Sequence, residues 1–336
     1  MRKILPLCFL VFAFKTGIAQ KSFEIGVSTG ITNYYGDLGN QEFYQAGSTR
    51  PGLGITVRNF IKPKAVSGQQ YRALNYEAKV AWYRLGYDET KPIGNAEGFE
   101  LRNYGRGLSF RTDLFSVEGH ITYTLYPNIR QPLHVQKTAM YFYTGLGVYY
   151  GKPKADLFRG SIDISNRYYF WKDGTIRDAD ESTGHGNIIE KDGKYETNLA
   201  DWKTEGSGYS TEFGKGTPNC FYNLGIPIGA GIRYGLNRQL TLSIDFTYYH
   251  LFCDNIDDVS SRYAYESEIE TNFPGDPAKQ QLAAYISDPT GYGTDGHAGP
   301  QTSPRGNPSK KDSFSFLNVE LAYRFEFIPK KIFGMK

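Results

Sequence analysis

Residues Phe221–Phe252 read FYNLGIPIGAGIRYGLNRQLTLSIDFTYYHLF, and their side chains alternate in character along two arms. The apolar face of the first arm consists of Tyr222, Leu224, Ile226, Ile228, Ala230, Ile232 and Tyr234. That of the second arm consists of Leu240, Leu242, Ile244, Phe246 and Tyr248. Because successive side chains of a strand point to opposite faces, this pattern predicts a β-hairpin that turns at Leu236–Gln239.

The same two-faced pattern recurs in six further segments, which makes eight in all. They are Phe23–Thr32, Leu53–Phe60, Leu74–Tyr83, Leu114–Tyr126, Met140–Tyr150 and Leu317–Phe327. Most approach the roughly 9–11 residues that a tilted transmembrane strand needs. An even number of antiparallel strands closes without an edge, as lipid requires. The predicted fold class is therefore all-β: an eight-stranded antiparallel transmembrane β-barrel.

The polar faces of these segments carry acids and bases on nearly every strand. The charged residues predicted to form a barrel-interior network are Glu24, Arg58, Glu77, Lys79, Glu118, Arg233, Asp245, Glu320, Arg324 and Glu326. Turned inward, they can pair with one another, as buried charges must. Side chains just fill the interior of a barrel of this size, so we expect no pore. The alternative is a soluble β-sandwich or lipocalin-like barrel with its apolar face inward.

Residues 1–19 are predicted to be a signal peptide. Arg2 and Lys3 precede the apolar run Leu5–Phe14, and the small residues of Gly17–Ala19 precede the expected cleavage. The run is shorter than the ~20 residues of a membrane-spanning helix. The alternative is a buried N-terminal strand or helix. With the signal peptide removed, residues 20–336 form one exported barrel in this interpretation.

Charge and cysteine content narrow the class of protein further. Loss of the signal peptide removes three basic side chains and takes the formal net charge from +3 to zero. Without a basic surplus, no nucleic-acid partner is expected.

The mature chain keeps Cys220 and Cys253, at matching ends of the hairpin. A disulfide suits an oxidising compartment, but strict alternation places these two side chains on opposite faces.

Connection lengths predict an orientation in the membrane. The turn at Leu236–Gln239 is short, whereas the loops at about 151–220 and 253–316 are very long. This asymmetry is typical of an outer-membrane barrel with short periplasmic turns and long extracellular loops. We therefore expect the cell outer membrane as the location and its lipid as a partner.

The long loops themselves show signs of structure. Hairpins are predicted around Lys172–Gly174 and Lys191–Gly193, and a short helix over Ala278–Ile286, opened by Asp276 and Pro277. The aromatic run Tyr168–Trp171 is either a partner contact or the inside of a folded loop.

An acidic group follows the hairpin, at Asp254, Asp257 and Asp258. Clustered carboxylates can bind a hard cation such as calcium. The competing interpretation is a solvated acidic turn whose side chains cap loop backbone. No cofactor other than this calcium candidate is expected.

No pattern of catalytic residues is apparent. The five histidines lack metal-ligand spacing, and neither a nucleophile-elbow nor a phosphate-loop motif is present. His250 with Asp245 is the nearest acid–base pair, but the two residues differ in parity. We therefore expect that the protein is not an enzyme.

Three blocks of the sequence resemble one protein family. Glu24–Gly39, Asn223–Ser260 and Arg305–Phe325 are similar to PorG-like outer-membrane barrels of the Bacteroidota. The closest similarity lies in Tyr35–Leu38, Leu236–Gln239, Asp257–Ser260 and Arg305–Pro308, none of which is a catalytic signature.

The resemblance implies a component of the type IX protein secretion system that helps to anchor periplasmic ring proteins. The 151–220 loop is longer than expected for that family, which leaves a paralogue with another partner open. Two functions are therefore expected as alternatives. One is a scaffold for a type IX-like secretion machine, and the other is a structural or adhesive protein whose long loops bind extracellular ligands or partner proteins.

Overall fold

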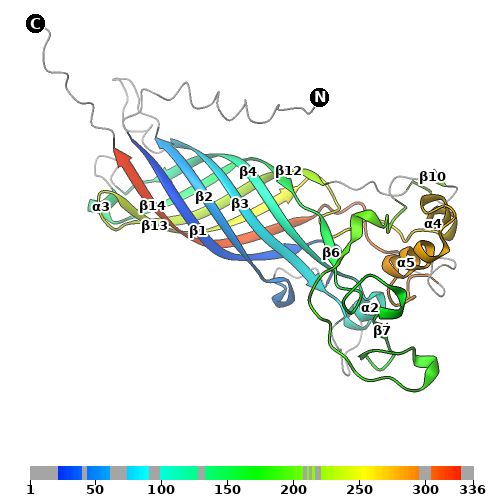
Figure 1. Cartoon of the computed structure of the whole chain (residues 1–336). Coiled ribbons are helices and arrows are strands. Elements are labelled where there is room, and N and C mark those ends of the chain that lie inside the picture. Colours follow the sequence, from blue (N-terminus) through cyan, green and yellow to red (C-terminus); the bar gives the residue numbers. More distant parts are fainter. Residues whose placement is uncertain are drawn as a thin grey trace, which may run out of the picture.

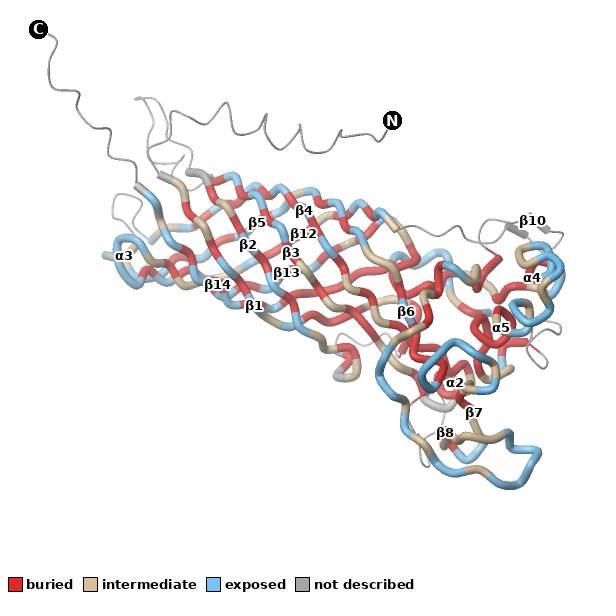
Figure 2. The backbone as a smooth tube through the Cα atoms, in the orientation of Figure 1, coloured by how far each residue is buried: buried red, intermediate tan, exposed pale blue. Residues whose placement is uncertain are grey.

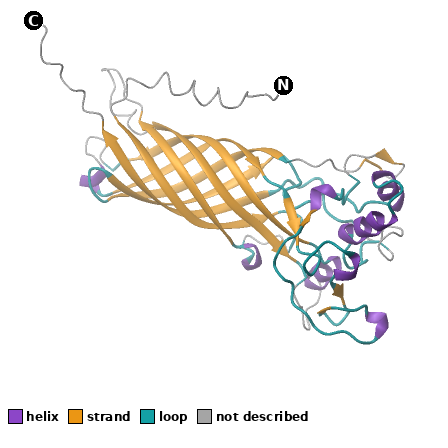
Figure 3. Cartoon of the chain, in the orientation of Figure 1, coloured by secondary structure: helices purple, strands orange, loops and turns teal. Residues whose placement is uncertain are grey.

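The eight predicted segments form eight long antiparallel strands in a computed structural model of the chain (Figures 1 and 3). It describes residues 22–39, 44–60, 74–90, 99–127, 133–206, 210–211, 214–215, 221–294 and 304–326. The predicted signal peptide, residues 1–19, lies outside the described residues. The long strands are β1 (Ser22–Tyr35), β2 (Arg50–Phe60), β3 (Leu74–Asp88), β4 (Ser109–Leu125), β5 (Thr138–Tyr150), β12 (Tyr222–Gly235), β13 (Leu240–Leu251) and β14 (Ser313–Glu326).

These strands close into a barrel. Neighbours along the sheet are β3, β2, β1, β14, β13, β12, β5 and β4, and β3 pairs with β4 to complete the ring. The first and last strands meet along their whole length, from Ser22 opposite Glu326 to Tyr35 opposite Ser313. The prediction of an eight-stranded antiparallel barrel is confirmed.

Buried and exposed residues alternate along the long strands, as the colours in Figure 2 show. The outward face is apolar around the barrel, and we call it the apolar band. Its exposed members include Val27, Ile31, Leu53, Ile55, Tyr76, Val80, Phe115, Val117, Ile121, Phe142, Leu146, Val148, Leu224, Ile228, Ile232, Ile244, Phe246, Leu317, Val319 and Leu321. A soluble protein rarely leaves so large an apolar surface uncovered. A bilayer covers such a surface, and this is the outward face of a transmembrane β-barrel.

Some strands run farther than the alternation predicted. β3 ends at Asp88 rather than Tyr83, and β4 begins at Ser109 rather than Leu114. Their pairing continues to Asp88 opposite Ser109. Here Leu85 and Phe110 are fully buried. The alternation ends because loops cover both faces of this extension.

The two ends of the barrel differ. At the short-turn end, Leu236–Gln239 joins β12 to β13, and the helix α3 (Leu133–Gln136) lies between β4 and β5. Asn237 Oδ1 accepts hydrogen bonds of 2.8 Å from the backbone N–H groups of both Gln239 and Leu240. These bonds close the predicted hairpin turn.

The other end carries a folded cap, visible at the right of Figure 3. We call residues 99–108, 151–206, 252–294 and 304–312 the loop module. Its helices are α2 (Phe99–Arg106), α4 (Glu266–Asn272) and α5 (Pro277–Ser287), with 3-10 turns at Ile164–Asn166, Glu181–Thr183 and Leu199–Asp201. Its short strands are β6 (Pro153–Ala155), β7 (Tyr169–Phe170), β8 (Ile176–Arg177) and β9 (Thr197–Asn198). Further short elements of the chain are the 3-10 turn η1 (Ala46–Ser48) and the pair β10 (Ser210–Thr211) and β11 (Gly214–Lys215).

Predictions for the loops had mixed outcomes. The helix opened by Asp276 is present, and Asp276 Oδ1 accepts a 3.1 Å hydrogen bond from Lys279 N–H. The hairpin around Lys172–Gly174 is also present, as β7 pairs with β8. The second hairpin, around Lys191–Gly193, is wrong. Gly193 turns the chain with φ of +71°, but the flanking residues bond to neighbouring loop segments instead of to each other.

Two further observations concern the chain as a whole. Among the described residues, no helix is both long and apolar enough to cross a membrane. Cys253 is disulfide-bonded, against the expectation from strict alternation. Cys220 lies outside the described residues.

Candidate functional site

A network of ion pairs fills the barrel interior near the short-turn end. Its centre is Arg58 of β2, which is 2% exposed. The guanidinium donates to Glu77 Oε1 at 2.6 Å, Glu320 Oε1 at 2.9 Å and Glu24 Oε2 at 3.1 Å. Arg233 reaches Glu77 at 2.8 Å and Arg324 reaches Glu24 at 2.7 Å. Three guanidinium groups therefore balance three buried carboxylates, and of these six groups Arg324 alone is partly exposed.

Not all of the charged residues expected in this network join it. Glu118 accepts from Ser116, Tyr83 and His120, at 2.6, 3.0 and 2.9 Å. Lys79 donates to Tyr249 OH at 3.3 Å, and Asp245 accepts from Tyr141 and Tyr143, each at 2.8 Å. Tyrosines, together with Ser116 and His120, thus take the place of the expected Arg and Lys partners. The side chain of Glu326 lies outside the described part of the chain.

Aromatic rings pack across the barrel above the ion pairs. Tyr249 and Phe314 stack at 4.3 Å, and Tyr83 lies 5.1 Å from both Phe314 and Phe316. Tyr149 meets Tyr249 edge-on at 5.9 Å. All five side chains are fully buried. They close the interior towards the loop module.

The acidic group Asp254, Asp257 and Asp258 lies just beyond this aromatic layer, at the mouth of the barrel. All three are buried, so the turn is not solvated as that interpretation supposed, although Asp257 does cap loop backbone as it predicted. Asp254 accepts a 2.7 Å hydrogen bond from Ser260 Oγ, and Asp257 accepts one of 2.9 Å from Val259 N–H. These bonds hold the 254–260 segment closed on itself.

Two buried arginines hold further acids at this mouth. Arg305 is 1% exposed and lies 3.2 Å from Glu205 and 3.5 Å from Asp258. Arg106 donates to Glu89 Oε2 at 2.9 Å and to the carbonyl oxygen of Arg305 at 2.9 Å. We call this assembly the mouth cluster: Asp37, Glu89, Arg106, Glu205, Asp254, Asp257, Asp258, Arg305 and Asp312.

Burial dominates the electrostatics of the mouth cluster. Loss of hydration raises the pKa of Asp258 to about 7, although Arg305 opposes the shift. Burial raises the pKa of Asp37 to about 6, against a hydrogen bond from the Asn307 backbone. Burial also raises the pKa of Asp257 and that of Asp312. The neighbouring carboxyls Asp37 and Asp254 reinforce both shifts, and Asp257 reinforces that of Asp312. Burial and mutual repulsion therefore both favour the neutral forms of these acids.

Three stretches that carry the family resemblance meet in the mouth cluster. Asn307 N–H donates to Asp37 Oδ2 at 2.7 Å, and Tyr34, directly before Tyr35–Leu38, donates to Asp257. Arg305 pairs with Asp258. The resembling residues thus meet in one structural unit whose centre, at Asp37, Asp258 and Arg305, is buried.

A pocket of about 450 Å³ opens in the loop module. The aromatic run singled out in the sequence forms one wall, extended by Arg167 and Lys172. Asp180–Ser182 and residues 285, 289 and 290 form the remainder. Tyr168 is buried, whereas Tyr169, Phe170 and Trp171 are half-buried. The pocket therefore combines aromatic faces with charged groups of both signs.

Contacts among the lining residues and from just outside the pocket hold its walls in place. Arg177 lies over the Trp171 ring at 4.0 Å, and Trp171 Nε1–H donates to the carbonyl oxygen of Ala179 at 2.8 Å. Arg167 lies over the Tyr169 ring at 4.5 Å. Cation–π contacts of this kind orient both partners. The pocket is thus formed before any ligand arrives.

Sequence reasoning found only part of this pocket. The aromatic run was visible as four consecutive ring-bearing residues, but Asp180, Glu181 and Tyr285 come from other segments. Only the folding of the loops brings them together. His250 and Asp245, the nearest acid–base pair in the sequence, make different contacts. Asp245 accepts a hydrogen bond from Tyr141 inside the barrel, whereas His250 packs edge-on against Phe252 at 5.8 Å.

The closed barrel, the apolar band and the folded cap define an outer-membrane-type β-barrel. No known family pattern matches the sequence, and no curated protein sequence matches it. Among solved structures, Ail, the attachment invasion locus protein of Yersinia pestis, is 8% identical, with 90% of this chain and 98% of that chain covered and a TM-score of 0.33.

Two other outer-membrane proteins are similar to the same extent. Neisserial surface protein A is 7% identical, with 91% of this chain and 100% of that chain covered and a TM-score of 0.35. A major outer membrane protein from Thermus thermophilus is 12% identical, with 90% of this chain and 99% of that chain covered and a TM-score of 0.34. At such low identity and TM-score, these likenesses carry no argument about function.

Proposed function

We propose that this protein is an outer-membrane binding protein whose barrel anchors it in lipid and whose loop module presents a pocket to extracellular ligands. The pocket beside the Tyr168–Trp171 run is the observation that carries this proposal. Its volume of about 450 Å³ falls in the range of small-molecule sites. The filled interior supports an anchoring role for the barrel, since it leaves no room for transport.

The lining of the pocket favours a glycan as the ligand. Half-buried aromatic faces at Tyr169, Phe170 and Trp171 offer flat apolar surfaces on which sugar rings can stack. Lys172, together with the acids at 180 and 181, supplies hydrogen-bonding groups for hydroxyls. In this proposal the protein is not an enzyme, and no cofactor takes part in binding.

Binding to a glycan array tests the proposal. The full chain, refolded in lipid nanodiscs, should bind a subset of glycans, and Trp171→Ala should weaken that binding at least about tenfold, as expected for loss of roughly 1.4 kcal/mol of contact. Ile188→Ala is the matched control, because Ile188 is an exposed apolar residue of the same module outside the pocket lining. Equal binding by wild type and Trp171→Ala would contradict the proposal.

A second candidate is a scaffold for a type IX-like secretion machine that binds periplasmic ring proteins. The meeting of the resembling segments at Asp37, Asp258 and Arg305 favours it, because shared sequence then corresponds to one structural unit. Those residues are buried, so they shape the barrel mouth and do not themselves contact a partner. Co-purification after mild crosslinking is the test. Recovery of ring proteins supports the scaffold, and their absence argues against it.

A further inference from the structure

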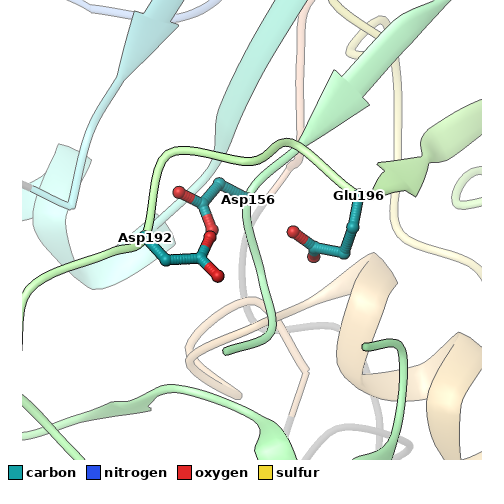
Figure 4. A group of neighbouring side chains, drawn as sticks. All are labelled: Asp156, Asp192 and Glu196. Atoms are coloured by element: carbon teal, nitrogen blue, oxygen red, sulfur yellow. The ribbon is translucent and has the colours of Figure 1, made fainter. Parts of the chain in front are cut away.

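Three carboxylates from two segments of the loop module point towards one another (Figure 4). They belong to Asp156, Asp192 and Glu196, and one ligand oxygen of each lies within 4.8 Å of the other two. They are distinct from the mouth cluster and from the pocket lining. Asp156 follows β6 directly, and Glu196 directly precedes β9.

Backbone pairing explains how two of these carboxylates come together. β6 and β9 are antiparallel, with Ala155 opposite Thr197. Asp156 and Glu196 therefore leave the same end of this short ladder. The turn at Gly193 brings Asp192 to them, since Gly193 N–H donates to Asp156 Oδ2 at 2.7 Å. Three carboxylates are thus held close by the fold.

Asp156 and Glu196 each have one carboxylate oxygen that is satisfied and one that is not. Glu196 Oε1 accepts from the N–H groups of Leu157 and Phe158, both at 3.0 Å. Glu196 Oε2 and Asp156 Oδ1 are buried and have no hydrogen-bond partner. Asp156 is only 3% exposed. A buried carboxylate oxygen without a partner is strongly unfavourable, which points to a ligand that this oxygen accepts.

Nearby cations do not neutralise the group. Lys194 reaches Asp192 Oδ2 at 2.9 Å, but its side chain is 63% exposed. Lys191 pairs with Asp88, with Nζ 3.3 Å from Asp88 Oδ1, and its charge only partly offsets that of Asp156. Asp156 and Glu196 therefore remain as close like charges, and such a pair is destabilising unless a cation separates it.

We propose that Asp156, Asp192 and Glu196 form a calcium site that clasps the 156–160 segment to the 190–197 segment. Calcium suits this group because it accepts irregular oxygen geometry, whereas magnesium requires a near-ideal octahedron. Three carboxylates complemented by water and backbone oxygens correspond to a weak site, with a Kd on the order of 0.1–1 mM, as in extracellular modules.

Bound calcium would also steady one wall of the pocket. Tyr168 OH accepts a 2.9 Å hydrogen bond from the N–H of Asp192. Tyr168 belongs to the pocket lining. The site itself is independent of the proposed glycan binding, because none of its three carboxylates lines the pocket.

Terbium luminescence on the full chain in nanodiscs tests the site. Tyr168 lies close enough to Asp192 to sensitise bound Tb³⁺, and calcium should displace it at a concentration on the order of 1 mM. The Asp156→Asn/Glu196→Gln double variant should lose at least about 90% of the displaceable signal, which corresponds to a tenfold or greater loss of affinity. Glu190→Gln, which removes an exposed carboxylate of the same segment, should keep it.

A second measurement needs no variant. Limited proteolysis of the wild-type chain should cut within 156–197 at least several-fold faster in EDTA than in millimolar calcium, while the barrel stays intact on a heat-modifiability gel. If calcium neither displaces terbium nor slows cleavage, the buried oxygens bind only water and the calcium site is wrong. If the double variant binds terbium as tightly as wild type, these residues are not the ligands.

Discussion

Replacement of Arg58 by methionine is the sharpest test of the barrel interior. Arg58 contacts Glu24, Glu77 and Glu320, all within 3.1 Å. Methionine preserves most of the side-chain length but leaves three buried carboxylates facing the two remaining guanidinium groups. Removal of one partner from a buried ion pair costs about 3–5 kcal/mol. The unfolding equilibrium should therefore shift by a factor on the order of 10²–10⁴.

Urea unfolding in phospholipid vesicles, read by tryptophan fluorescence and gel mobility, measures this cost. Arg238→Met is the matched control, because Arg238 is exposed in the short turn and should lose less than about 0.5 kcal/mol. The double variant Arg58→Met/Glu77→Gln restores the charge balance, so it should be no less stable than Arg58→Met alone. A cost below about 1 kcal/mol for Arg58→Met, or additive costs in the double variant, would refute the reasoning.

Three further predictions concern the rest of the molecule. In planar bilayers the purified protein should give no stable ion current, because Tyr249, Phe314 and their neighbours close the barrel; steady single-channel steps would contradict this. Gly145→Ala should destabilise the barrel by about 1–3 kcal/mol, because its Cβ would collide with the carbonyl oxygen of Gly119, whereas Gly119→Ala, which meets nothing within 4 Å, should be tolerated in the same urea assay. The raised pKa values of Asp37, to about 6, and of Asp258, to about 7, mean that the folded mouth cluster binds protons more tightly than the unfolded chain. Its stability is therefore complete below about pH 4 and falls as pH rises through 6–7, so hydrogen exchange at residues 254–260, corrected for intrinsic rates, should be at least about a hundredfold faster near pH 8.5 than near pH 5. Exchange that is independent of pH would show that these carboxyls keep ordinary pKa values.

The barrel was predictable because a single physical rule governs it. Lipid outside and a narrow polar interior force strict alternation, so residues such as Val27 and Glu24 reveal their faces in the sequence. The same rule placed Arg58, Glu77 and Arg233 inside. It could not predict that Lys79, Glu118 and Asp245 would form hydrogen bonds with tyrosines. Those partners depend on the strand register and on which side chains lie at the same height in the barrel.

The loop module was far less predictable. Once strands rise beyond the membrane, both faces are covered and alternation carries no information, as Leu85 and Phe110 show. Short sequence motifs still predicted structure where the interaction is between neighbouring residues, as for the helix N-cap at Asp276. The carboxylates of Asp156 and Glu196 meet only through the short β6–β9 ladder, and no periodic pattern relates two residues joined in that way.

The aromatic layer across the barrel bears on how many copies of this protein a cell can carry. Every open pore adds a leak, so the abundance of a channel is limited by the barrier that the membrane must maintain. A barrel sealed by stacked Tyr249 and Phe314 is free of that limit. Its density on the cell surface can follow demand for the loop module alone, without exposing the cell to toxic solutes.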